Sequence, residues 1–195
     1  MVDDVPSVVG QTTVYAMAAA LREMAPAVNS EEFRAVLELL AKSPMIWVTG
    51  VGKSGFVAMR MASTFASIGI RAAFVDPTEL KHGGLGRLRR GDAFFVLSAS
   101  GTTQELLDLQ TKDMMEPAWV AITNPTSPLA EYSFICLPCA VPLEREGNPL
   151  GAPMVSCILQ AAWGDALAAA YIKKYDVRPQ DFRHHHPGGR FGGLR

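Results

Sequence analysis

Hydrophobic positions along the chain fall alternately into helical and strand-like patterns. Helical spacing predicts helices over residues 13–28, 30–41, 54–68, 103–115 and 153–175. Short apolar runs predict strands over residues 45–49, 71–75, 93–98, 118–123 and 134–137. Strands that alternate with helices indicate a parallel sheet covered on both faces, since buried parallel strands read as continuous apolar runs. The sequence therefore predicts an α/β fold, in which ligands bind at the carboxyl ends of the strands.

Two of these strands end in turns rich in glycine and hydroxyl residues, each followed by a helical pattern. The first turn lies within residues 48–55, VTGVGKSG, and the second holds Ser98, Ser100, Thr102 and Thr103. Backbone N–H groups, hydroxyls and a helix N-terminus together form a site for phosphate. Four hydroxyls exceed what one helix cap requires, and no arginine fork or magnesium-binding carboxylates accompany them. The pattern favours a sugar monophosphate over a nucleoside triphosphate.

The first turn leaves two other interpretations open. Its glycines are too closely spaced for a Walker A loop, but Gly50, Gly52 and Gly55 match the letters of a dinucleotide-binding fingerprint. Asp76 then stands about where the ribose-binding acid is expected. A tight strand-to-helix turn that needs only glycine geometry is the other alternative.

Composition narrows the class of protein. The 195 residues are 49% hydrophobic with a net charge of −1, which fits one domain and disfavours nucleic acid or an anionic membrane as partner. No signal-peptide pattern and no apolar run of about 18 residues is seen. We therefore expect a cytoplasmic protein. In a reducing cytoplasm we expect Cys136, Cys139 and Cys157 to be free, buried thiols without a redox or zinc role.

Several motifs, in order, resemble the sugar isomerase (SIS) domain family and, within it, the arabinose 5-phosphate isomerases. They are GKSG at 52–55, PTELKHGGLG at 77–86, SASG at 98–101, LERE at 143–146, GDAL at 164–167 and HPGG at 186–189. The resemblance implies a three-layer αβα sandwich of flavodoxin-like type around a five-stranded parallel sheet. It also implies a homotetramer that interconverts a ketose phosphate and its aldose isomer without metal or organic cofactor.

The whole chain is then expected to be a single SIS domain. Residues 1–42 would form N-terminal helices, residues 43–176 the core, and residues 177–195 a C-terminal segment. Many relatives continue beyond this point into a pair of cystathionine-β-synthase-type regulatory domains, which this chain is not expected to carry.

By motif position, the resemblance implies catalytic roles for four residues and substrate contacts for others. The catalytic candidates are Lys53, Glu105, Glu144 and His186, and the substrate-binding candidates are Ser54, His82, Ser98, Ser100 and Thr103. The hydroxyl pattern of the second turn adds Thr102 to the substrate-binding candidates. Glu144 is the preferred proton shuttle between C1 and C2, and His186 is assigned to ring opening or acid catalysis, in its own subunit or across an interface. A metal site is not expected, because the consecutive rings of His184, His185 and His186 cannot all face one ion.

Each candidate also has a structural alternative. Glu105 could serve the dipole of its helix, Glu144 could pair with Arg145, and Lys53 could be a solvated lysine. Two departures from the family leave the sugar open, namely Phe56 in place of a histidine and residues 154–157 with one hydroxyl. The alternatives for function are a non-catalytic phosphosugar-binding SIS module and an SIS isomerase for another sugar phosphate.

Overall fold

A five-stranded parallel sheet forms the centre of the computed structural model, which describes residues 5–110, 117–140, 148 and 150–188. The strands are β1 (Ile46–Gly50), β2 (Ala72–Phe74), β3 (Ala93–Ser98), β4 (Ala118–Thr123) and β5 (Ile135–Pro138). They lie in the order β2-β1-β3-β4-β5, and every neighbouring pair is parallel. The predicted α/β class and five parallel strands are confirmed, and β3 and β4 have the predicted bounds.

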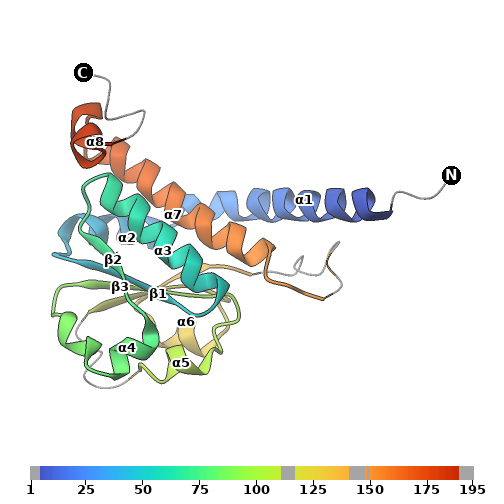
Figure 1. Ribbon diagram of the computed structural model, residues 1–195, viewed down its shortest axis with the longest axis horizontal. Helices are drawn as coiled ribbons and strands as arrows, with labels where there is room; N and C mark the ends of the chain where they lie inside the picture. The colour runs from blue at the N-terminus through green and yellow to red at the C-terminus, as the bar shows by residue number, and fades with distance from the viewer. Residues whose placement is uncertain (1–4, 111–116, 141–147, 149, 189–195) are drawn as a thin grey trace.

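Helices cover both faces of the sheet (Figure 1). One layer contains α2 (Glu31–Lys42), α3 (Lys53–Ser67) and α7 (Val155–Lys174), with α1 (Val5–Met24) packed on α7 and projecting from the body. The opposite layer contains α4 (Pro77–Lys81), the 3₁₀ turn η2 (Gly84–Arg87), α5 (Gln104–Leu107) and α6 (Pro128–Tyr132). The remaining elements are the 3₁₀ turn η1 (Ala25–Asn29) and α8 (Pro179–His185). The predicted three-layer sandwich is confirmed.

The side chains of β3 point alternately to the two faces of the sheet and so pack against both helical layers. All six of its residues are buried, and successive side chains point to opposite faces. Phe95 meets Phe65 of α3 in the first layer, with ring centroids 5.9 Å apart, while Phe94 meets Trp119 on the other face at 4.9 Å. Burying such rings stabilises the fold by roughly 1.5–3 kcal/mol for each side chain.

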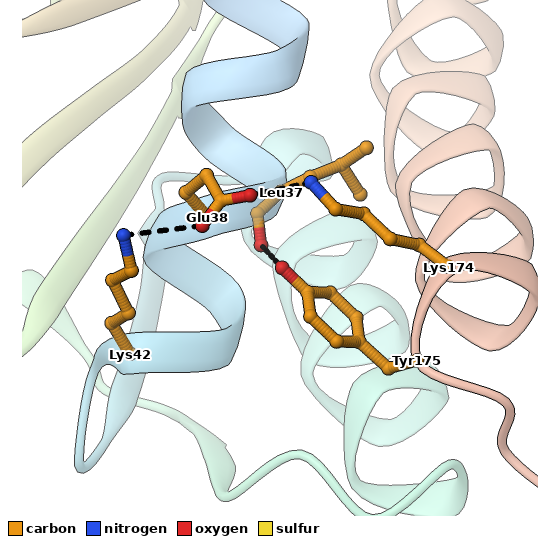
Figure 2. Close-up of polar contacts among 5 residues, drawn as sticks. All are labelled: Leu37, Glu38, Lys42, Lys174 and Tyr175. Atoms are coloured by element: carbon orange, nitrogen blue, oxygen red, sulfur yellow. Dashed lines mark hydrogen bonds and ion pairs between the residues drawn. The ribbon is translucent and has the colours of Figure 1, made fainter.

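Polar contacts fasten α7 to α2 at the amino edge of the sheet (Figure 2). The Glu38 carboxylate pairs with Lys174 of α7 and, at 3.1 Å, with Lys42. The Tyr175 hydroxyl lies 3.5 Å from the Leu37 carbonyl oxygen, to which it donates. Hydrogen bonds from Lys174 and Lys42 lower the pKa of the Glu38 carboxyl.

Four features differ from the sequence prediction. Helix α1 begins at Val5, and the helix predicted over residues 103–115 ends at Leu107, while residues 111–115 lie outside the described part of the chain. Beyond Asp108 the backbone bonds are of the tighter i→i+3 type, and Leu106 and Leu109 lie in the same apolar cluster. The short helices α4, α6 and α8 were not predicted.

The fourth difference concerns α7. By length and composition this helix is apolar enough to cross a membrane, although we expected no such run. In the structure 44% of its apolar window is buried, against α1, α2 and α3. A core helix passes the same test, so the observation is weak support for a membrane span.

Candidate active site

The two predicted turns meet at the carboxyl edge of the sheet. From β1 the chain passes to β2 on one side, while β3 lies on the other, so the strand order reverses between β1 and β3. Gly50, the last residue of β1, is in register with Leu97 near the end of β3. The helices that follow these strands, α3 and α5, cover opposite faces of the sheet. Doubly wound sheets bind their ligands where the strand order reverses in this way.

The first turn requires close contact between two glycines. A Cβ atom on Gly55 would lie 2.7 Å from the Gly50 carbonyl oxygen. Gly52, with φ +60°, begins α3 without a side-chain cap. Lys53 is exposed and Ser54 is half-buried in the first turn of this 15-residue helix. Uncapped N–H groups and the positive end of the helix dipole therefore lie at the carboxyl edge of the sheet.

The second turn is held by its own hydroxyls. The Ser98 and Thr103 oxygens lie 3.0 Å apart, and the Ser98 oxygen accepts a bond from the Gly101 N–H at 3.1 Å. The Ser100 oxygen accepts bonds from the Thr102 amide (3.3 Å) and hydroxyl (3.0 Å). Thr103 is the N-cap of α5, yet its side chain makes no capping bond. Helix capping therefore does not explain these hydroxyls. Because α5 has only one turn, its dipole contributes little to the binding of an anion.

The end of β4 supports the second turn from beneath. Gly101 has φ +68°, and a Cβ atom there would lie 2.0 Å from the Ser127 oxygen and 2.5 Å from that of Thr123. The Asn124 N–H donates to the Ala99 carbonyl oxygen at 3.2 Å. These positioning residues were missed from the sequence, although TNPTS at 123–127 repeats the pattern of a strand that ends in hydroxyls.

Helix α4 carries His82 to the neighbourhood of α5. Lys81 of α4 pairs with Asp108 at 2.6 Å, and this bond, followed by one from Gln104, lowers the pKa of the Asp108 carboxyl. His82 follows Lys81 directly, and Glu105 lies three residues before Asp108. Both side chains are exposed. The ion pair thus brings the His82 loop beside the helix that carries Glu105.

The chain's own His186 lies far from this edge. It ends α8, where it stacks on Phe182 with ring centroids 4.0 Å apart and bonds the Phe182 carbonyl oxygen at 2.9 Å. Helix α8 packs at the far end of α3, where His185 adjoins Gly69. The 15 residues of α3 span roughly 22 Å. One protomer therefore does not bring its own His186 to its two turns, and Glu144 lies outside the described residues.

A buried polar group that we did not predict is Gln160 in the second turn of α7. The residue is fully buried, and within the described part of the chain neither the nitrogen nor the oxygen of its carboxamide has a hydrogen-bond partner. The sequence does indicate this residue, because Gln160 is a polar residue among the apolar positions Val155, Leu159 and Trp163 that form the buried face of α7. Such groups are rare in native proteins, so an ordered water is the ordinary explanation.

The three cysteines form no disulfide, and within the described residues no three histidine, cysteine or acidic side chains are placed so that they could hold one metal ion. Cys139 is buried as expected, whereas Cys136 and Cys157 are half-buried. Burial raises the pKa of the Cys136 thiol, which lowers its thiolate fraction.

Comparison with known proteins identifies the family. The SIS domain matches residues 39–170, two thirds of the chain, including both turns. The chain belongs to the SIS domain family. Among curated relatives, arabinose 5-phosphate isomerase KpsF of Escherichia coli is 36% identical over 184 residues, and KdsD of Francisella tularensis is 37% identical over 160 residues. These alignments cover 92% and 80% of this chain but only 56% and 48% of the relatives, so the chain spans about half their length.

A solved SIS neighbour extends the comparison to three dimensions. The structure of an Escherichia coli CFT073 protein in complex with arabinose 5-phosphate superposes with a TM-score of 0.83 at 29% identity. The superposition covers 96% of this chain and 100% of that one. Because the chain belongs to this family, we assign the turn at Gly50, Gly52 and Gly55 to an SIS domain and not to a dinucleotide-binding fold.

Proposed function

We propose that this SIS domain is an aldose–ketose isomerase that interconverts arabinose 5-phosphate and ribulose 5-phosphate. The observation that carries the proposal is the pair of turns at the carboxyl edge, where the bonded hydroxyls of Ser98, Ser100, Thr102 and Thr103 follow the strand next to the one that leads into an uncapped helix N-terminus. Both curated relatives bear the name arabinose 5-phosphate isomerase. The arabinose 5-phosphate complex of the Escherichia coli neighbour supports the same substrate class.

The phosphate would be bound chiefly by hydroxyls and backbone amides, without a metal ion or a pair of arginines. On binding, its oxygens accept the bonds that the hydroxyls now make with one another, together with bonds from turn amides. Lys53 and Ser54 stand at the start of α3, where Lys53 can compensate the phosphate charge or that of an enediolate. His82 would complete the pocket from the Gly-rich loop after α4.

The reaction needs one carbon-bound proton and one oxygen-bound proton to move. A carboxylate removes the proton from C2 of the open-chain aldose and returns it to C1, through a cis-enediol. The proton of the C2 hydroxyl passes to the C1 oxygen, so atoms and charge balance. Glu105 and Glu144 are the candidate bases, and His186 is the candidate acid for ring opening. No metal or organic cofactor has a role in this scheme.

We further infer a cytoplasmic homo-oligomer, a tetramer by resemblance, in which His186 serves a neighbouring subunit. Large apolar side chains are exposed on α3 and α7 near the candidate site, among them Phe56 (70%) and Met154 (41%). Such surfaces in a folded domain mark contacts between chains. This arrangement gives Phe56, which replaces the histidine common in the family, a packing role.

The test is turnover by the purified chain. Arabinose 5-phosphate should be converted to ribulose 5-phosphate and the reverse, while a panel of other aldose phosphates should react more slowly. Turnover of another sugar phosphate alone would overturn the proposed substrate. Stabilisation by sugar phosphates in a thermal-shift screen without any turnover would instead support a non-catalytic binding module.

A further inference from the structure

A concavity of about 350 Å³ lies at the amino edge of the sheet, opposite the candidate active site. The residues that line it precede or begin β1, β2 and β3, apart from Arg87, the last residue of η2. They include the side chains of Arg71, Arg87, Arg89 and Arg90. A strand of five residues separates this edge from the turns by roughly 17 Å. The concavity is therefore distinct from the sugar-phosphate site.

The positive charge of this concavity is only partly compensated within the described chain. Its only acidic lining residue is Asp92. No carboxylate of the described residues lies within ion-pair distance of the four guanidinium groups. The ion pairs that do form involve Lys42, Lys174, Arg60, Lys81 and Arg178. Four guanidinium groups around one concavity repel one another unless an anion lies between them.

Asp92 stabilises the turn that carries two of these arginines. Its buried carboxylate accepts a bond from the Trp47 indole N–H at 3.1 Å and one from the Arg89 amide at 2.9 Å. The Asp92 N–H in turn donates to the Arg89 carbonyl oxygen at 3.1 Å. The Arg89 guanidinium is itself bonded to the carbonyl oxygens of Gly86 and Leu88. The turn is therefore fixed; Arg89 and Arg90 are both exposed, but the Arg89 guanidinium is already bonded to backbone oxygens.

Three guanidinium groups, those of Arg71, Arg87 and Arg90, remain available to a ligand, and all three residues are exposed. Guanidinium groups bind phosphoryl oxygens in pairs of parallel hydrogen bonds. A monophosphate with two charges would leave part of this positive charge uncompensated, whereas a chain of two or three phosphoryl groups would match it. The volume suits a small ligand rather than a nucleic acid.

We propose that the concavity at the amino edge is a second anion site, which binds an oligophosphate through Arg71, Arg87 and Arg90. Either inorganic oligophosphate or the phosphate chain of a nucleoside triphosphate supplies this chemistry. The half-buried Trp47 ring in the lining offers an apolar contact that only a nucleotide would use. The inference does not depend on the proposed isomerase activity.

Calorimetric titration of the whole chain with inorganic tripolyphosphate, ATP and inorganic phosphate tests the proposal. We expect tripolyphosphate to bind at least tenfold more tightly than phosphate, with affinity falling as salt rises. Tighter binding of ATP would identify a nucleotide site, and equal binding an oligophosphate site. Failure of tripolyphosphate to bind at millimolar concentration would overturn the proposal.

Variants then locate the site. The double substitution Arg87→Gln, Arg90→Gln should weaken tripolyphosphate binding at least tenfold. Arg22→Gln, Arg183→Gln makes the same change of charge on α1 and α8 and should change binding less than twofold. Equal effects of the two pairs would indicate general charge attraction and overturn the site. So would loss of tripolyphosphate binding in the Ser98→Ala, Ser100→Ala variant, since the ligand would then occupy the sugar-phosphate turn. Melting temperatures of all variants report whether they fold.

Discussion

The hydroxyl oxygens of Ser98 and Thr103 lie 3.0 Å apart and close the turn that leaves β3. One residue ends the strand and the other begins α5, so a single hydrogen bond joins the two elements across the turn. Ser98 is 3% exposed, whereas Ser100 and Thr102 above it are exposed. The turn thus has a fixed base and an accessible rim, which is how a preorganised anion site is built.

Replacing Gly101 by alanine should destabilise the protein strongly. The new Cβ atom would meet the Ser127 and Thr123 oxygens at 2.0 and 2.5 Å, and the positive φ adds backbone strain. We expect a loss of about 2–4 kcal/mol in the free energy of unfolding, measured by urea denaturation. Gly86→Ala is the matched control, because nothing lies within 4 Å of its Cβ position, and it should change stability by about 0.5 kcal/mol or less. Equal effects would show that β4 does not support the turn.

The Glu38 contacts predict a loss of stability in acid. Because Lys174 and Lys42 lower the pKa of this carboxyl in the folded state, its contribution is present above the ordinary glutamate value of about 4.3 and disappears as pH falls below it. Urea midpoints measured from pH 6 to pH 3 should therefore decline less in Glu38→Gln than in the wild type. Glu23→Gln on the exposed side of α1 should behave like the wild type. A parallel decline in all three proteins would contradict the assignment.

Mixing inactive variants should restore activity if His186 serves a neighbouring subunit. His186→Ala keeps the turns and Lys53→Met keeps the histidine, so a hybrid oligomer contains sites with both groups intact. Random exchange would return about a quarter of wild-type activity, because half the subunits offer each intact group. Each variant refolded alone provides the baseline. Confirmed subunit exchange without any gain would place His186 in its own subunit's mechanism or outside the reaction.

Long periodic segments were predictable because their pattern is dictated by burial. Apart from Ser98 and Thr123 at their ends, β3 and β4 are apolar in sequence, and all their residues but the half-buried Ala118 are buried. The spacing within α2 and α3 matches their buried faces. The short helices were not recognised, because five to seven residues are too few to show periodicity. Each nevertheless begins with a proline, Pro77, Pro128 or Pro179, in its first turn. Proline at that position is a start signal that the sequence carried.

The two turns of the candidate site were placed together correctly because parallel strands share one carboxyl edge. The sequence could not show which long-range partners fix them, since Ser127 and Thr123 lie some 25 residues from Gly101. It likewise could not show that α8 sits at the far end of α3 from Lys53. The roles of Glu105, Glu144 and His186 and the single-domain division of residues 1–195 stay predictions.

The central claim is that the hydroxyl turn after β3 holds the phosphate of the substrate. Calorimetric titration of the Ser98→Ala, Ser100→Ala variant with arabinose 5-phosphate tests it most directly. We predict at least a tenfold loss of affinity, or about 1.4 kcal/mol, from these two hydroxyls. Ser67→Ala, Ser133→Ala removes two hydroxyls bonded within α3 and α6 and should bind as the wild type does. Wild-type affinity in the Ser98→Ala, Ser100→Ala variant, for arabinose 5-phosphate and ribulose 5-phosphate alike, would contradict the account.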